Sequence, residues 1–96
     1  MEVLVAYDVA TDSAAGRKRL RRVAHVCEAH GQRVQQSVFE CILDDLQLEL
    51  LVHRLAREIA PDEDSLRIYR LLEPRERYTR VFGQPVTHDL RDPLVL

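Results

Sequence analysis

The sequence predicts an α+β fold in which two helices pack on one antiparallel sheet. Short apolar runs rich in β-forming residues alternate with longer segments whose apolar residues recur every three or four positions. The resulting order is strand, helix, strand, strand, helix, strand. With 96 residues the chain is long enough for one small core, so we expect a single domain over residues 1–80 and an additional segment over 81–96.

The first strand and the first helix are recognisable from their ends. Residues 3–7 form an apolar run that ends on one carboxylate, Asp8. The Thr-Asp-Ser sequence at 11–13 offers N-caps for the helix that follows, and Gly31 is a suitable stop. The helix has an apolar stripe at the spacing i, i+3, i+4, i+7, formed by Leu20, Val23, Ala24 and Cys27.

The second half of the chain shows the same kinds of strand and helix signal. Residues 33–36 and 38–43 are predicted strands joined by a tight turn around Gln36 and Ser37. A second helix begins after Asp44 and Asp45 and is ended by the Pro-Asp-Glu-Asp sequence at 61–64, before a fourth strand at 65–72. The apolar stripe of this helix is Leu48, Leu51, Val52, Leu55 and Ile59. The order β-α-β-β-α-β is that of the ferredoxin-like fold.

The third strand is apolar on both of its faces. Phe39 and Cys41 point to one face, and Val38 and Ile42 point to the other. Because the two helices cover only one face, we expect a second protomer to cover the other. Residues 81–96 contain short apolar pieces interrupted by glycine and proline, and we expect this segment to add a strand to the partner's sheet in a two-fold homodimer.

The charges are unevenly distributed along the chain. Fourteen basic and sixteen acidic residues give a net charge of −2, which argues against indiscriminate coating of nucleic acid. One face can nevertheless be basic, since the first helix carries five clustered bases. These are Arg17, Lys18, Arg19, Arg21 and Arg22. We find no signal-like or membrane-spanning segment and expect a cytoplasmic protein with reduced cysteines and no membrane association.

The chemistry suggested by the sequence centres on Asp8. A carboxylate beside a basic helix can hold a hard metal ion and a phosphate together, and Mg²⁺ uses one or two carboxylates with waters and phosphate oxygens. Two copies of Asp8 across a two-fold axis would supply such a pair. The alternative is that Asp8 only ends a strand and starts a turn. Around it, Arg33 and Ser37 on the hairpin could reach a phosphate, whereas Tyr7 and Phe39 fit either base stacking or core packing.

Several motifs in combination resemble a known family. They are Val-Ala-Tyr-Asp-Val at 5–9, Gly-Arg-Lys-Arg-Leu at 16–20, Gly-Gln-Arg-Val-Gln at 31–35, Ser-Val-Phe-Glu at 37–40 and Asp-Ser-Leu-Arg-Ile-Tyr at 64–69. Together they are similar to the CRISPR-associated endoribonuclease two family, the small partner of the CRISPR integrase in spacer acquisition. The resemblance covers essentially the whole chain. Gln36 departs from it, since many members have an aromatic residue there.

The resemblance implies a homodimer with exchanged C-terminal strands and Asp8 of each protomer as a ligand of Mg²⁺, with Mn²⁺ as a possible substitute. It also implies that CRISPR integrase dimers are partners, bridged by this dimer. Members of the family are described as cutting single-stranded RNA or double-stranded DNA. The residues that match positions supporting nuclease activity are Tyr7, Arg17, Arg19, Arg33 and Phe39.

Three functions remain open from the sequence. The leading one is a magnesium-dependent endonuclease that acts on RNA or DNA in spacer acquisition. The alternative is a non-catalytic DNA-binding scaffold that bridges integrase dimers, in which Arg17 and Arg21 hold the duplex backbone. The third is a ferredoxin-like regulatory module for a small ligand, which the low glycine content disfavours. No element of the sequence distinguishes RNA from DNA.

Overall fold

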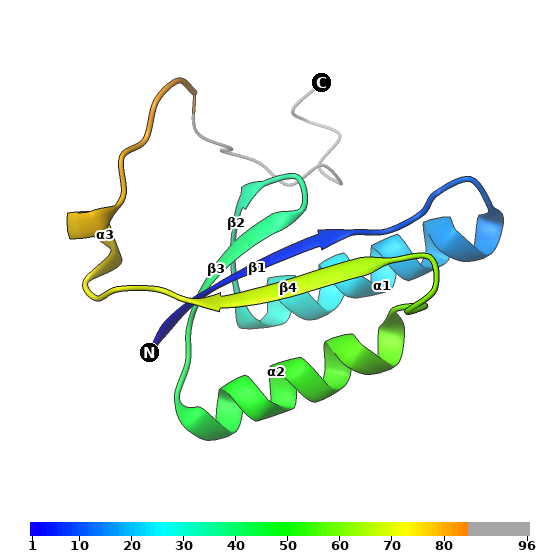
Figure 1. The fold of residues 1–96 in the computed structure, drawn as a ribbon, viewed down its shortest axis with the longest axis horizontal. Helices are drawn as coiled ribbons and strands as arrows, with labels where there is room; N and C mark the ends of the chain where they lie inside the picture. The colour runs from blue at the N-terminus through cyan, green and yellow to red at the C-terminus, as the bar shows by residue number, and fades with distance from the viewer. Residues whose placement is uncertain (85–96) are drawn as a thin grey trace.

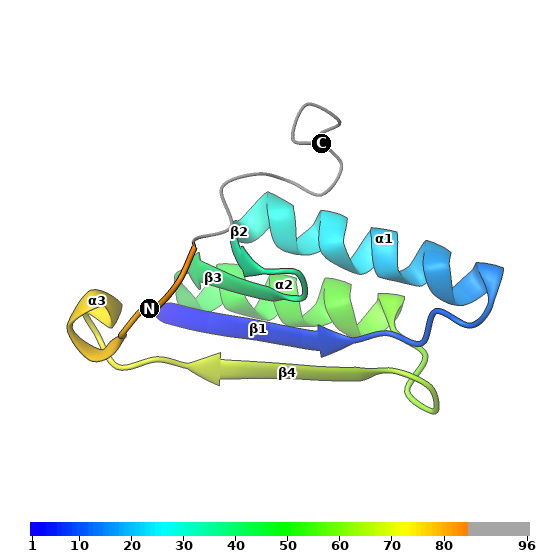
Figure 2. The same ribbon diagram turned by 90° about the horizontal axis from the view of Figure 1, so that it is seen from above.

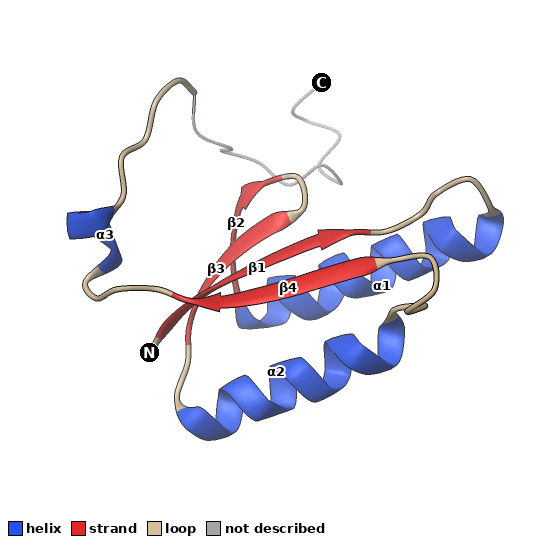
Figure 3. Ribbon diagram, viewed as in Figure 1, coloured by secondary structure: helices blue, strands red, loops and turns tan. Residues whose placement is uncertain are grey.

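The computed structural model describes residues 1–84 and confirms the predicted α+β fold (Figure 1). A short helix, α3, follows the fourth strand and was not predicted from the sequence (Figure 3). In chain order the elements are β1 (Glu2–Asp8), α1 (Ala14–His30), β2 (Gly31–Gln35), β3 (Val38–Ile42), α2 (Asp45–Glu58), β4 (Ser65–Arg70) and α3 (Arg75–Tyr78).

The four strands form one antiparallel sheet in the order β2-β3-β1-β4. Strand β1 is central, and its Val5 is paired with Phe39 of β3 on one side and with Ile68 of β4 on the other. Helices α1 and α2 lie side by side on the same face of the sheet (Figure 2). This arrangement is the ferredoxin-like fold, and it places Asp8 at the end of a central strand.

The core lies between the sheet and the two helices. Alternate residues of β1 point into it, and the predicted stripes of both helices pack against them, except that Val52 of α2 is half-buried and lies outside the core cluster. The fully buried side chains include Val3, Val5, Val23, Cys27, Phe39, Cys41, Leu51 and Leu55. Both cysteines are free, as predicted.

The other face of the sheet is open in the single chain. Leu4 and Ala6 of β1 are half-buried on this face, and Ile42 of β3 is 69% exposed. Arg75 of α3 extends onto the same face and pairs with Glu2 at 2.6 Å and with Glu40 at 2.8 Å. The cover by a second protomer that we expect from the sequence therefore remains a prediction.

The predicted caps are present at the start of both long helices. The Ser13 hydroxyl oxygen accepts a hydrogen bond from the Gly16 amide at 3.0 Å. Asp44 and Gln47 form a reciprocal capping box, in which the Asp44 carboxylate accepts from the Gln47 amide and the Gln47 side chain accepts from the Asp44 amide. These caps fix where each helix leaves the sheet.

Gly31 ends α1 for a reason that the sequence did not reveal. Its φ of −163° is extended, so no left-handed conformation is needed, and strand β2 begins at this residue without a loop. A Cβ atom added at Gly31 would overlap the Cys41 sulfur and the Glu40 carbonyl oxygen. The absence of a side chain therefore lets β2 approach β3 closely.

The structure describes only the first residues of the segment that is predicted to exchange between protomers. Residues 81–84 have no regular secondary structure, and residues 85–96 lie outside the described residues. Strand exchange therefore stays a prediction. No helix among residues 1–84 is both long and apolar enough to span a membrane.

Candidate nucleic-acid interface at the end of the first strand

Asp8 is exposed at the carboxyl end of β1, paired in register with Ser65 of β4. It is the last residue of the strand and points away from the core, because Tyr7 before it and Val9 after it are both buried. The fold thus presents a carboxylate at the rim of the molecule with both of its neighbours fixed in the core. That position makes Asp8 accessible to a ligand in solvent.

An open groove of about 870 Å³ runs from Asp8 along α1 to the β2–β3 hairpin. Among its lining residues are Lys18, Arg21 and His25 of α1, and Ser37 in the turn of the hairpin. The three helical residues occupy positions i, i+3 and i+7, which lie on one face of a helix. The groove therefore joins the carboxylate to a row of nitrogen-bearing side chains.

Beneath the groove, Tyr7 and Phe39 form part of the core. Their ring centroids lie 6.3 Å apart with an interplanar angle of 22°, and the Arg33 guanidinium carbon lies 4.9 Å from the Phe39 ring centroid. Burial is the main cause that raises the pKa of Tyr7 to about 12, so its hydroxyl is protonated at neutral pH. Tyr7 and Phe39 are thus packed side chains here and do not offer a ring face to solvent.

The same cluster holds the β2–β3 turn in place. The Gln36 carbonyl oxygen accepts hydrogen bonds from Arg33 at 2.7 Å and from the Tyr7 hydroxyl at 3.5 Å. The Ser37 carbonyl oxygen accepts from the Tyr7 amide at 3.1 Å. Arg33 also pairs with Glu28 of α1 at 3.6 Å. The structure therefore brings Tyr7, Arg33, Ser37 and Phe39 together next to Asp8.

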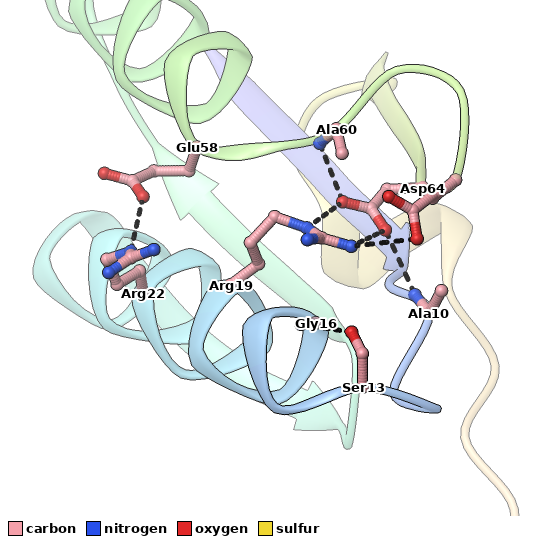
Figure 4. Close-up of polar contacts among 9 residues, drawn as sticks. Ala10, Ser13, Gly16, Arg19, Arg22, Glu58, Ala60 and Asp64 are labelled. Carbon is pink, nitrogen blue, oxygen red and sulfur yellow. Dashed lines mark hydrogen bonds and ion pairs between the residues drawn. The ribbon is translucent and has the colours of Figure 1, made fainter.

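Arg17 and Arg19 do not line the groove. Arg17 is exposed near the start of α1 and donates to the Thr11 carbonyl oxygen at 3.2 Å. Arg19 forms a bidentate pair with Asp64, through its Nε at 2.9 Å and its Nη2 at 3.3 Å (Figure 4). Of the five clustered bases of α1, Arg19 is therefore unavailable to the basic face that the sequence predicts, because Asp64 holds its guanidinium.

The sequence assigned no role to Asp64 beyond its place in the helix-ending turn at 61–64 and in the motif at 64–69. Its side chain has no exposed surface, and it accepts four hydrogen bonds, two from Arg19 and one each from the Ala10 and Ala60 amides (Figure 4). The hydrogen bond from Arg19, together with those from the two amides, lowers the pKa of Asp64 to about 2 against the opposing effect of burial. Asp64 is therefore ionised throughout the neutral range.

The depressed pKa of Asp64 gives a pH-dependent prediction. Because the folded state holds this carboxylate ionised more strongly than the unfolded state, its contribution to stability is present above pH 3.8 and is lost as pH falls toward 2. We expect the difference in free energy of unfolding between wild type and Asp64→Asn to become smaller as the pH falls from 3.8 to about 2. Urea unfolding followed by circular dichroism between pH 2 and 5 measures it; the exposed Asp62→Asn is the control. A difference in free energy of unfolding that stays constant with pH would contradict the lowered pKa of Asp64.

The donor set around Asp8 suits a hydrated hard cation. Among residues 1–84, no three acid, histidine or cysteine side chains cluster in a way that would hold a metal ion. A single exposed carboxylate is nevertheless compatible with Mg²⁺, which retains several waters and shares its ligands with phosphate. A second copy of the chain would add a second carboxylate. One protomer thus offers half of the ligand pair that the sequence predicts.

The fold and the groove together define a small ferredoxin-like protein with an exposed carboxylate at a strand end, in one groove with several basic side chains, the kind of surface that suits a phosphate-bearing ligand. A family model described as CRISPR associated protein Cas2 matches residues 1–79. The chain belongs to this family. The resemblance inferred from the sequence motifs is therefore confirmed.

Curated relatives and a solved structure extend this similarity over nearly the whole chain. The CRISPR-associated endoribonuclease Cas2 1 of Moorella thermoacetica is 53% identical over 96 residues, with full coverage of both chains. The CRISPR-associated endonuclease Cas2 of Halalkalibacterium halodurans is 50% identical over 95 residues, which is 99% of each chain. The crystal structure of Streptococcus pyogenes Cas2 matches with a TM-score of 0.79 and 47% identity, over 86% of this chain and 100% of that one.

Proposed function

We propose that this protein is a CRISPR-associated, magnesium-dependent endonuclease that cleaves phosphodiester bonds during spacer acquisition. The observation that carries the proposal is the exposed Asp8 carboxylate at the end of β1, in one groove with Lys18 and Arg21. The names of similar proteins, endoribonuclease in one and endonuclease in another, support the reaction class, and the first of them names RNA as the substrate of that protein.

Each group in the groove has a chemical role under this proposal. Bound Mg²⁺ would supply an activated water and polarise the phosphate. Asp8 would hold the ion, and Mn²⁺ could replace it because both ions prefer oxygen ligands. Lys18 and Arg21 would neutralise and orient the nucleic-acid backbone. Tyr7, Arg33, Ser37 and Phe39 would act by keeping the hairpin wall of the groove in place, and the exposed Arg17 would add backbone contact beyond it.

The proposal requires a homodimer. One Asp8 is a poor metal site, whereas two copies related by a two-fold axis would supply two carboxylates. The open face of the sheet, with Ile42 exposed and Leu4 half-buried, is a surface that a second copy would cover, and residues 81–96 would cross to the partner's sheet edge. The same dimer would bridge two CRISPR integrase dimers.

A cleavage assay with metal removal tests the proposed reaction. We expect purified protein to cut single-stranded RNA or double-stranded DNA in Mg²⁺, to lose this activity in excess EDTA, and to regain it when Mg²⁺ or Mn²⁺ is restored, because water activation depends on the ion. Gel analysis of end-labelled substrates gives the rate. Cleavage that persists in EDTA, or absence of cleavage under all of these conditions, would contradict the proposal.

The scaffold function is the second candidate, and one observation favours it. Lys18 and Arg21 are exposed and form no ion pair with any residue in the described part of the chain, so they are available to DNA phosphates whether or not Asp8 is present. A scaffold would bind duplex DNA with a steep salt dependence and with little regard to sequence. Spacer acquisition that survives loss of Asp8 would favour the scaffold over the nuclease.

A further inference from the structure

Asp64 connects three segments that are far apart in the sequence. Its carboxylate accepts hydrogen bonds from the Ala10 amide at 3.1 Å, in the loop after β1, and from the Ala60 amide at 2.8 Å, in the loop after α2. The third segment is α1, through the bidentate pair with Arg19 (Figure 4). Asp64 itself immediately precedes β4. One buried carboxylate therefore fixes both loops at this end of the sheet.

One of these two loops directly follows Asp8, the last residue of β1. Ala10 lies two residues after Asp8, and Val9 between them is buried in the core. The Ala10 carbonyl also lies against α1, since a Cβ added at Gly16 would overlap the Ala10 oxygen. The backbone after Asp8 is thus held through a core side chain, an amide hydrogen bond and close packing, which fixes the point from which the Asp8 side chain extends.

The Arg19 guanidinium is already paired with acidic side chains of the same chain. Its side chain is only 13% exposed and is paired with Asp64 at 2.9 Å and with Glu63 at 3.8 Å. Its Nε and Nη2 face Asp64 and are not directed to a ligand. Lys18 beside it is exposed and lines the groove. Neighbouring bases on one helix therefore have different roles.

We propose that Asp64 and Arg19 form a latch whose function is to position Asp8, and that neither residue contacts the substrate. They are positioning residues: the latch sets the orientation of the metal-binding carboxylate through the Ala10 amide. The inference deepens the proposed nuclease function and rests on it for its kinetic consequence. It assigns to Arg19 a role different from the phosphate contact expected of a base in this helix.

The test uses full-length Arg19→Ala, Asp64→Asn and the double variant, with Arg19→Lys as the conservative change. We expect kcat to fall about 10- to 100-fold in each single variant, because small displacements of a reacting group have effects of this size. The Mg²⁺ concentration for half-maximal rate should rise. The double variant should be no slower than the worse single variant, and Arg19→Lys should be intermediate because lysine lacks the bidentate fork.

Substrate affinity separates a latch from a phosphate contact. The dissociation constant for DNA, and its slope against salt concentration, should be unchanged in Arg19→Ala, whereas Lys18→Ala should reduce the slope by about one. A reduced slope in Arg19→Ala with unchanged kcat would overturn the proposal. Additive losses in the double variant would also overturn it. If Asp64→Asn fails to fold by circular dichroism, Arg19→Ala carries the test, since it keeps the carboxylate and removes only the two hydrogen bonds that orient it toward the Ala10 amide.

A measurement that does not depend on cleavage tests the latch separately from the nuclease function. If wild-type protein does not cleave, the proposed function fails, and amide hydrogen exchange and backbone relaxation at residues 8–10 then decide the latch. Asp64→Asn should speed exchange at Ala10 and increase motion at Asp8, and Asp62→Asn should change neither. Unaltered exchange and motion in Asp64→Asn would overturn the latch itself.

Discussion

Replacement of Asp8 by alanine is expected to reduce cleavage at least about 1000-fold, because a bound metal ion contributes several kcal/mol to charge stabilisation and about 1.36 kcal/mol corresponds to a factor of ten in rate. The side chain is exposed at the end of β1, so its removal should change stability by no more than about 0.5 kcal/mol. Single-turnover cleavage in Mg²⁺ and urea unfolding measure the two effects separately.

Asp12 provides the matched control for this variant. It is an exposed acid in the loop after β1, four positions beyond Asp8, and it does not line the groove. Asp12→Ala removes the same charge from the same end of the molecule and should retain the wild-type rate. Undiminished cleavage by Asp8→Ala, or an equal loss in both variants, would remove Asp8 from the reaction.

Phe39→Ala should have the largest effect on stability, a loss of about 3–5 kcal/mol, as expected for a fully buried aromatic side chain. Phe39 has no exposed surface, stacks on Tyr7 and lies under the Arg33 guanidinium. The loss is a large part of the roughly 5–15 kcal/mol that stabilises a typical domain. Urea unfolding at pH 7 measures it, and cleavage by this variant should fall in proportion to the unfolded fraction.

Leu46 provides the control for Phe39, since it is a large apolar side chain of α2 that is 70% exposed and lies away from the face expected to meet a second copy. Leu46→Ala should change stability by less than about 0.5 kcal/mol. If Phe39→Ala remained fully folded and still lost cleavage, the contribution of Phe39 would lie in holding the hairpin wall of the groove through Tyr7 and Arg33, and not in global stability.

The fold could be predicted because its local signals agree with one another. The apolar stripes of α1 and α2 are the faces that are buried, Ser13 and Asp44 cap the helices as expected, and the hairpin turns at Gln36 and Ser37. The ends were less accurate: β2 begins at Gly31, two residues earlier than predicted, because the glycine allows β2 to follow the helix without a loop. Helix α3 has only four residues and no buried side chain, so it left no periodic pattern to detect.

The site was predicted in part. A strand-end carboxylate beside a basic helix is visible in sequence, and the spacing of Lys18, Arg21 and His25 could have identified the groove-facing side of α1. The role of Asp64 could not be predicted, because its partners Arg19 and Ala10 are 45 and 54 positions away. Only the packing of the two loops brings them together.

The central claim is that two copies of the chain share one site, with Asp8 from each holding the metal ion. Mixed dimers that carry one wild-type and one Asp8→Ala protomer, isolated with two different affinity tags, test it most directly. A shared site predicts cleavage below about a tenth of the wild-type rate, because one carboxylate cannot replace the pair. Mixed dimers that cleave at half of the wild-type rate would contradict the claim, since each protomer would then contain a complete site of its own.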